Sequence, residues 1–147
     1  ERFLVTKTDT PAQRYSFQAM VSAPGELTFS NNRNRSRTER ISIYDAINGM
    51  SVDKLKESLR RIYGLDIYQD FKRAKVIYEY PSRSTINAAR FAGTPIQEAL
   101  KGELRVGSRY AYWVEVARAR NGKAFTGQMT VFLKSDLDKL KEELRNR

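Results

Sequence analysis

The stretch 109–134, RYAYWVEVARARNGKAFTGQMTVFLK, constrains the fold more than any other part of this 147-residue sequence. It contains two runs in which apolar and polar side chains alternate, and Asn121-Gly122 separates them. A period of two is typical of β-strands, and an Asn-Gly pair accepts the two positive φ angles of a type I′ turn. The sequence therefore predicts an antiparallel hairpin that turns at these two residues.

A two-residue turn at this position also predicts the register of the hairpin. The expected pairs are 118 with 125, 116 with 127, 114 with 129, 112 with 131 and 110 with 133. One face of the hairpin is then apolar and consists of Tyr110, Tyr112, Val114, Val116, Met129, Val131 and Leu133. The other face is half polar, because it combines Ala111, Trp113 and Phe132 with Glu115, Gln128 and Thr130.

Further strands are predicted by alternating stretches bounded by turn residues. Pro24-Gly25 suits the centre of a type II turn, in which glycine accepts the positive φ angle. Pro81 cannot continue a strand ladder, so it marks the end of the alternating stretch before it. The expected strands cover about 14–22, 26–30, 40–46 and 73–81.

A helix is predicted at 51–63. Ser51 can cap its N-terminus, Asp53 lies in its first turn, and Gly64 follows its last residue. The helix should pack by one face, because its apolar residues recur with helical spacing at Val52, Leu55, Leu59 and Ile62. Further helices are expected at 82–93, 94–102 and 135–147; Gly93 and Gly102 close the first two.

The order of these elements predicts a single α+β domain that covers residues 1–147. Residues 1–13 are expected to be extended or disordered. We expect an antiparallel or mixed sheet of about five to six strands, with helices packed on one face and a helix at the C-terminus. A doubly wound parallel sheet is disfavoured, because strands and helices do not alternate regularly.

The composition favours a binding protein over an enzyme. A net charge of +10, from 27 Lys and Arg against 17 Asp and Glu, attracts polyanions. The absence of Cys and His excludes thiolate nucleophiles, Ser-His-Asp triads and the usual zinc sites. Two carboxylate pairs, Asp66 with Asp70 and Glu79 with Glu115 on strands expected to be neighbours, are the remaining acid–base or hard-metal candidates, but no pattern forces either pair together. We therefore expect no catalysis, no metal and no cofactor.

The candidate polyanion-binding residues lie in the stretch 31–40 and at the tip of the predicted hairpin. The first stretch contains four arginines and three asparagines and no apolar side chain, so it suits either phosphate contacts or a solvated connector. The proposed contacts are Arg33, Arg35, Arg37, Arg40, Arg118, Arg120 and Lys123. Lys54, Lys56, Arg60 and Arg61 add charge on the first predicted helix. Possible aromatic contacts are Tyr110, Tyr112 and Trp113, although such residues in strands serve more often in the core.

These observations predict a non-catalytic basic module that binds a polyanion, with the nucleic acid backbone as the first choice. The alternative is an assembly or scaffold protein that docks an acidic protein partner. A membrane surface is less favoured, because the C-terminal helix has a narrow apolar stripe and mixed charges. The sequence leaves the compartment open: the cytoplasm is slightly favoured, and an extracytoplasmic mature form is the alternative, because the chain starts at Glu1 and not at Met.

The double substitution Arg35→Ala with Arg37→Ala tests the predicted loop contacts. If both arginines touch phosphates of duplex DNA, the plot of log K against log salt should lose about two units of slope. Fluorescence anisotropy over a series of salt concentrations measures this slope. An unchanged slope would remove the loop from the interface.

Overall fold

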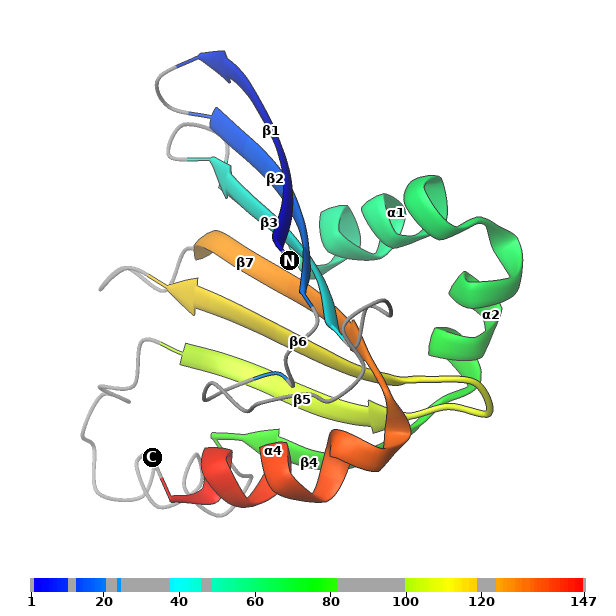
Figure 1. The fold of residues 1–147 in the computed structure, drawn as a ribbon. Helices are drawn as coiled ribbons and strands as arrows, with labels where there is room; N and C mark the ends of the chain where they lie inside the picture. The colour runs from blue at the N-terminus through cyan, green and yellow to red at the C-terminus, as the bar shows by residue number, and fades with distance from the viewer. Residues whose placement is uncertain are drawn as a thin grey trace, which may run out of the picture.

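The structure, a computed structural model, describes residues 2–10, 13–20, 24, 38–45, 49–81, 100–118 and 124–146. Its strands are β1 (Arg2–Thr10), β2 (Gln13–Met20), β3 (Thr38–Asp45), β4 (Lys75–Tyr80), β5 (Leu100–Val106), β6 (Ala111–Arg118) and β7 (Ala124–Phe132). Its helices are α1 (Val52–Tyr63), α2 (Leu65–Arg73), the short 3₁₀ helix η1 (Lys134–Asp136) and α4 (Leu137–Arg145). Across these ranges, seven strands form one sheet in the order β1-β2-β3-β7-β6-β5-β4 (Figure 1).

Every described strand pair in this sheet is antiparallel, which confirms the predicted α+β class. The strands expected at 14–22, 40–46 and 73–81 correspond to β2, β3 and β4. The sheet has more strands than expected, because residues 2–10 form β1 and 100–106 form β5. The expected strand at 26–30 and the expected helix at 82–93 lie outside the described residues.

The hairpin of β6 and β7 has the predicted register over most of its length. Val116 pairs with Gly127, 114 with 129 and 112 with 131. The predicted pair of 118 with 125 is wrong: the register shifts after Ala117, and Arg118 pairs with Ala124. The shift places one extra residue, Phe125, in β7, as in a β-bulge. The predicted turn residues themselves, 121 and 122, lie outside the described ranges.

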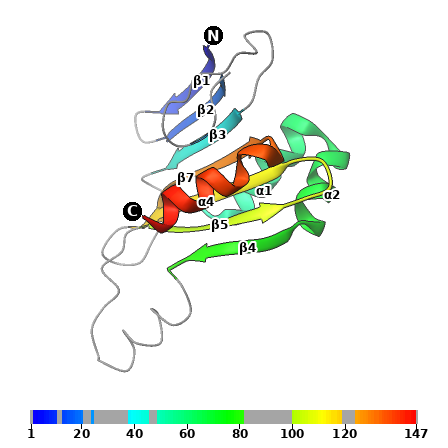
Figure 2. The same ribbon diagram turned by 60° about the horizontal axis from the view of Figure 1, so that its bottom comes forward.

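The two faces of this hairpin contact different helices. On one face, the core cluster of β3, β6 and β7 with α1 and α2 contains Ile41, Met50, Leu55, Leu59, Phe71, Tyr112, Val114, Val116, Met129 and Val131. On the other face, α4 packs through three leucines, and this second cluster contains Leu104, Ala111, Trp113, Phe132, Leu137, Leu140 and Leu144. Figures 1 and 2 show α4 across the sheet from α1 and α2.

Helices therefore cover both faces of the sheet, whereas the sequence predicted helices on one face. The physical reason lies in the half-polar face of the hairpin. Its apolar members, Ala111, Trp113 and Phe132, lie together at one end of β6 and β7, so that end can bury the leucine stripe of α4. Glu115 and Gln128 lie further along the same face.

Helix α1 begins and ends as predicted. The Ser51 hydroxyl accepts a hydrogen bond from the Lys54 N–H at 3.3 Å, and Gly64 follows the helix with a φ of 85°. Helix α2 was not predicted and begins directly after Gly64. Within the described residues, no helix is long and apolar enough to cross a membrane.

The helix predicted at 94–102 is wrong at its C-terminal end. β5 begins at Leu100, and Gly102 pairs with Glu115 of β6 on one side and Tyr80 of β4 on the other. A Cβ atom at Gly102 would collide with the Tyr80 side chain, so this glycine makes room for the Tyr80 ring and does not close a helix. Residues 94–99 lie outside the described residues.

Leu59→Ala should destabilise the fold far more than Ile62→Ala in the same helix. Leu59 is 0% exposed, and truncating it would leave a cavity that costs about 2–5 kcal/mol of the free energy of unfolding. Ile62 is 39% exposed, so its truncation should cost less than about 1 kcal/mol. Urea unfolding followed by circular dichroism measures both values. Equal losses would contradict the packing of α1 on the sheet.

Candidate functional site

The structure describes two of the seven predicted polyanion-binding cations, Arg40 and Arg118. The other five, Arg33, Arg35, Arg37, Arg120 and Lys123, lie outside the described residues. Arg40 lies within β3 and belongs to the sheet. Its Nε donates to Thr130 Oγ1 at 3.4 Å, and its guanidinium carbon lies 5.5 Å from the centroid of the Trp113 ring.

Arg40 and Arg118 do not come together. Arg40 pairs with Thr130 of β7, which in turn pairs with Trp113 of β6. Arg118 lies five positions after Trp113 in β6, which corresponds to about 17 Å along the strand at its usual rise per residue. Thr38, which lies within the stretch 31–40 and begins β3, pairs with Phe132 at the opposite end of β7 from Ala124. The two predicted contact regions therefore join the sheet at opposite ends.

The candidate aromatic contacts belong to the core. Tyr112 is 0% exposed and Trp113 is 5% exposed, so neither ring offers a face on which a base could stack. Tyr110 is half-buried and packs against the cluster beneath α1 and α2. This outcome agrees with the core role that the sequence analysis gave as the more frequent one.

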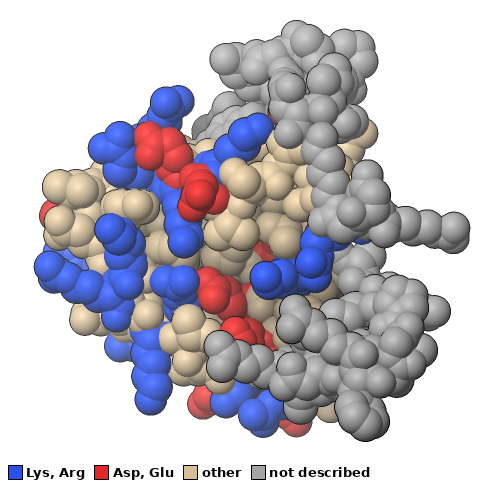
Figure 3. Space-filling model, turned by 180° about the vertical axis from the view of Figure 1, so that it is seen from behind, with Lys and Arg blue, Asp and Glu red and all other residues tan. Residues whose placement is uncertain are grey.

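Three of the basic residues of α1 have acidic partners. Lys54 Nζ lies 3.6 Å from Asp45 Oδ2 and donates to the Gly49 carbonyl oxygen at 3.0 Å. Arg60 and Arg61 both pair with Glu57, at 3.0 and 3.5 Å. The Arg60 hydrogen bond lowers the pKa of the Glu57 carboxyl, so Glu57 stays charged and offsets part of the positive field of α1. Figure 3, which shows the molecule from behind relative to Figure 1, has Asp and Glu side chains among the Lys and Arg side chains.

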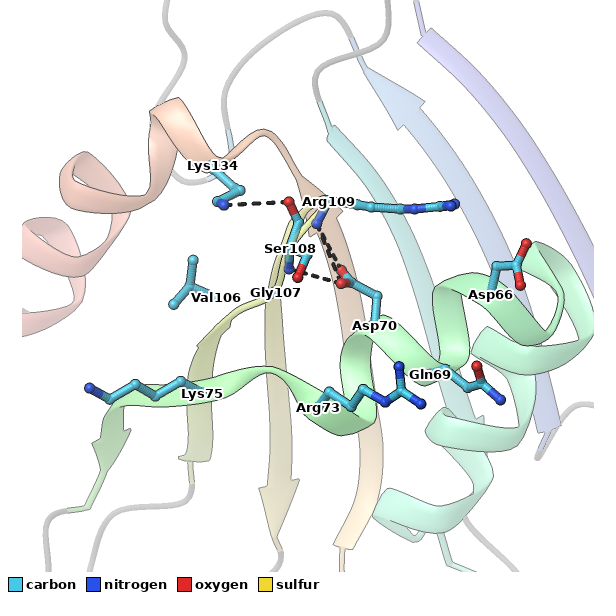
Figure 4. A pocket seen from close by; sticks show the side chains of 10 residues that line it. All are labelled: Asp66, Gln69, Asp70, Arg73, Lys75, Val106, Gly107, Ser108, Arg109 and Lys134. Carbon is cyan, nitrogen blue, oxygen red and sulfur yellow. Dashed lines mark hydrogen bonds between the residues drawn. The ribbon is translucent and has the colours of Figure 1, made fainter.

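A cationic cleft lies between α2, the turn that joins β5 to β6, and η1 (Figure 4). Its volume is about 630 Å³, which is within the usual range of ligand sites. Its charged residues are four cations and two carboxylates: Arg73, Lys75, Arg109, Lys134, Asp66 and Asp70. Gln69, Val106, Gly107 and Ser108 complete the lining. Sequence reasoning assigned none of these cations to a site.

The four cations of the cleft are solvent-exposed. Among the described residues, none of them forms an ion pair. Lys134 Nζ reaches the Ser108 carbonyl oxygen at 3.5 Å, which directs its ammonium group toward the turn (Figure 4). The cations come from the end of α2, the start of β4, the turn and η1. The cleft therefore presents positive charge from several sides.

Asp70 connects α2 to the turn behind the cleft. Its Oδ1 accepts a hydrogen bond from the Ser108 N–H at 2.8 Å, and its Oδ2 accepts one from the Tyr112 hydroxyl at 2.6 Å. The N–H groups of Arg109 and Tyr110 lie 3.3–3.4 Å from the same carboxylate. The turn also closes on itself, because the Gly107 N–H donates to the Tyr110 carbonyl oxygen at 2.9 Å.

These hydrogen bonds keep Asp70 ionised. Burial alone would raise the pKa of the Asp70 carboxyl, but the donors from Tyr112, Ser108, Arg109 and Tyr110 outweigh it and lower the pKa below its ordinary value. Burial and the hydrogen bond to Asp70 raise the pKa of Tyr112, which stays protonated and donates. A Cβ atom at Gly107 would collide with the Asp70 carboxylate, so the glycine allows this close approach.

The two carboxylate pairs noted in the sequence have different outcomes. Asp66 and Asp70 both lie on α2 and line the cleft, but Asp70 is engaged by the turn. The expectation that Glu79 and Glu115 lie on neighbouring strands is wrong, because β5 separates β4 from β6. The two glutamates also point to opposite faces of the sheet, since Glu115 aligns with Tyr80, the residue after Glu79. Within the described ranges, no group of three acidic residues is arranged to hold a metal ion.

Asp70→Asn should destabilise the fold by about 1–3 kcal/mol at pH 7, because it removes a charged acceptor from several hydrogen bonds. The pKa of Asp70 is lowered in the folded state, so its contribution is complete above the ordinary pKa of 3.8 and is lost as the pH falls through and below that value. The difference between the wild type and the variant should therefore shrink between pH 5 and pH 3.

Urea unfolding at pH 7, 5 and 3 measures this difference. Asp66→Asn is the matched control, because Asp66 lies one turn earlier on α2, is exposed and accepts no hydrogen bond from the turn. Equal effects of the two substitutions at pH 7 would contradict the role assigned to Asp70.

Comparisons with known proteins assign the chain to no family. No family model, no curated protein and no solved structure matches it. The function of the cleft therefore has to follow from its own geometry and charge.

Proposed function

We propose that the protein is a non-catalytic module that binds the phosphate backbone of nucleic acid through the cationic cleft. One observation carries the proposal: four exposed cations without ion pairs, as far as the chain is described, line one cleft. The expectation of a polyanion partner is retained. Its proposed principal contact moves from the Arg40 and Arg118 regions to the cleft.

The charge balance of the cleft favours an anion. The negative charge of Asp70 is already compensated by hydrogen-bond donors, which leaves Asp66 as the one lining carboxylate that can oppose the four cations. Guanidinium groups bind phosphate oxygens through paired hydrogen bonds, and Arg73 and Arg109 supply two of them. Lys75 and Lys134 add ammonium groups.

Binding through side-chain cations implies little sequence specificity. Phosphate contacts position a nucleic acid without reading its bases, and two of the three candidate stacking rings, Tyr112 and Trp113, are buried in the sheet. Binding should therefore be modest in affinity and should weaken steeply as salt displaces the protein from the phosphates.

A binding role suits the best-anchored carboxylate of the cleft better than catalysis. A general acid or base needs a pKa near the working pH and a free path for its proton. The pKa of Asp70 is lowered, and its oxygens face the turn and the Tyr112 hydroxyl. Asp70 is suited to hold α2 and the turn in place while the cations bind the ligand.

Arg109→Ala with Lys134→Ala should weaken the binding of a fluorescein-labelled 20-nucleotide single strand. If both side chains touch phosphates, the slope of log K against log salt should fall by about 1.4 units, because each single-strand contact contributes about 0.7. Fluorescence anisotropy from 50 to 300 mM KCl measures the slope.

Lys139→Ala with Lys141→Ala is the matched control. It removes the same charge from α4, on the far side of the sheet from α1 and α2, and should leave the slope within about 0.3 units of the wild type. Equal losses for the two double variants would show that only net charge matters and would contradict a specific cleft.

An acidic protein partner remains the competing function for the same cations. A complex that forms in lysate and survives nuclease treatment, but is lost with Arg109→Ala and Lys134→Ala, would favour this alternative over nucleic acid.

A further inference from the structure

A second, smaller pocket lies on the face of the sheet that α1 and α2 cover. Its volume is about 230 Å³, below the roughly 300–1,000 Å³ of pockets that enclose a whole small ligand, so it suits one ring system of a ligand. Its lining is apolar or aromatic apart from Glu39, the one charged residue there, and includes Tyr63, Ile67, Tyr110 and Leu133.

Glu39 occupies a position at which β3 otherwise carries apolar side chains. It alternates along the strand with Ile41 and Ile43 on the same face, and it pairs with Val131 of the core cluster. Glu39 is half-buried, and the Tyr63 hydroxyl donates a hydrogen bond to its Oε2. In the described part of the chain, no donor reaches Oε1 and no cation pairs with this carboxylate. A half-buried acceptor that is still unused favours a ligand that donates hydrogen bonds.

The pocket adjoins the cationic cleft. Three pairs of consecutive residues are divided between them, with the first of each pair in the pocket and the second in the cleft: Tyr110 and Arg109, Leu133 and Lys134, Ile67 and Asp66. Consecutive Cα atoms are about 3.8 Å apart, so the two cavities are neighbours at the turn, at η1 and on α2. A nucleotide carries its base and its phosphate on one sugar and therefore requires two adjoining sites.

The charge next to the pocket favours a neutral donor over a cation. A cation could pair with Glu39, but Arg109 and Lys134 adjoin the pocket and would repel it. A nucleobase is neutral, its faces can contact aromatic rings, and its edge carries N–H donors for a carboxylate. Guanine presents two adjacent N–H donors, which match the two oxygens of one carboxylate.

We propose that this pocket binds one unpaired guanine base of a strand whose phosphates lie in the cationic cleft. This inference rests on the proposed function and adds to it a base preference at one position. Glu39 accepts hydrogen bonds from the guanine edge, and the Tyr63 hydroxyl holds the carboxylate in position. Tyr110 and Ile67 contact the ring.

The test compares three 12-nucleotide DNA single strands: thymidine alone, thymidine with one central deoxyguanosine, and thymidine with deoxyinosine at that position. The deoxyguanosine strand should bind the wild type about tenfold more tightly than the thymidine strand, which is within the usual discrimination of a paired contact to a base edge. Deoxyinosine lacks the 2-amino group of guanine and should keep less than about threefold. Fluorescence anisotropy at one fixed salt concentration measures the three dissociation constants.

Glu39→Gln assigns the preference to the pocket. It should reduce the tenfold preference to less than twofold, because the amide replaces one acceptor oxygen with a donor that faces the donors of guanine. Glu142→Gln is the matched control: it removes the same charge from an exposed position on α4 and should keep the preference. The preference is a ratio of two affinities, so a general effect of charge or of the folded fraction cancels. A preference that survives Glu39→Gln would overturn the assignment.

The outcomes separate this inference from the proposed function. If the three strands bind equally and their binding is lost with Arg109→Ala and Lys134→Ala, the guanine pocket is overturned and backbone binding stands. If no strand binds, both proposals fail. The guanine pocket is also overturned if tetramethylammonium chloride, and not guanosine, changes the ¹H–¹⁵N shifts of Glu39 and Tyr63 relative to the same concentration of KCl, because the pocket then takes a cation.

Discussion

The carboxylate of Asp70 is the interaction on which the cleft depends. Helix α2 contributes this residue, and the turn between β5 and β6 contributes three N–H groups and, just beyond it, the Tyr112 hydroxyl. A partly buried carboxylate without donors would be costly, whereas one that accepts several hydrogen bonds stabilises the elements that supply them. Asp70 thereby positions the end of α2, with Arg73, against the turn that presents Arg109.

Packing on both faces of the sheet supports this arrangement. Phe71, the neighbour of Asp70, is fully buried, and its ring meets the Tyr112 ring edge-on with 5.4 Å between the ring centroids. Helix α2 is therefore held by apolar contact as well as by the Asp70 carboxylate. On the opposite face, the leucines of α4 cover Ala111, Trp113 and Phe132. The short helix η1 precedes α4, and Lys134 reaches the cleft from it.

The sequence predicted those helices and strands whose signals, such as turn and capping residues, lie within a few residues of the element itself. The hairpin register followed from the position of Asn121-Gly122, and α1 followed from Ser51 and Gly64. β5 was not predicted, although apolar and charged residues alternate along it. Gly102 also suits the end of a helix, and Glu103 and Arg105 of β5 face the core cluster beneath α1 and α2, where apolar side chains are expected. Arg105 is accommodated there because its Nε lies 2.8 Å from Glu103 Oε1 and because its guanidinium carbon lies 4.4 Å from the centroid of the Phe71 ring.

The candidate site could not be predicted in the same way. Arg73, Arg109 and Lys134 lie in three separate stretches of sequence, and no stretch carries a motif. Their proximity results from the sheet order and from the docking of α2, which are long-range consequences of the fold. Dense local charge, as in residues 31–40, was the stronger signal in the sequence, but residues that are close in sequence need not form the site.

Residue-resolved NMR during titration with a single-stranded oligonucleotide tests the central claim most directly. If the cleft binds the phosphate backbone, the largest ¹H–¹⁵N shift changes should occur at Arg73, Lys75, Lys134 and the turn 107–110. Changes confined to residues 31–40 and to the end of the hairpin near Arg118, with the cleft unaffected, would contradict the account.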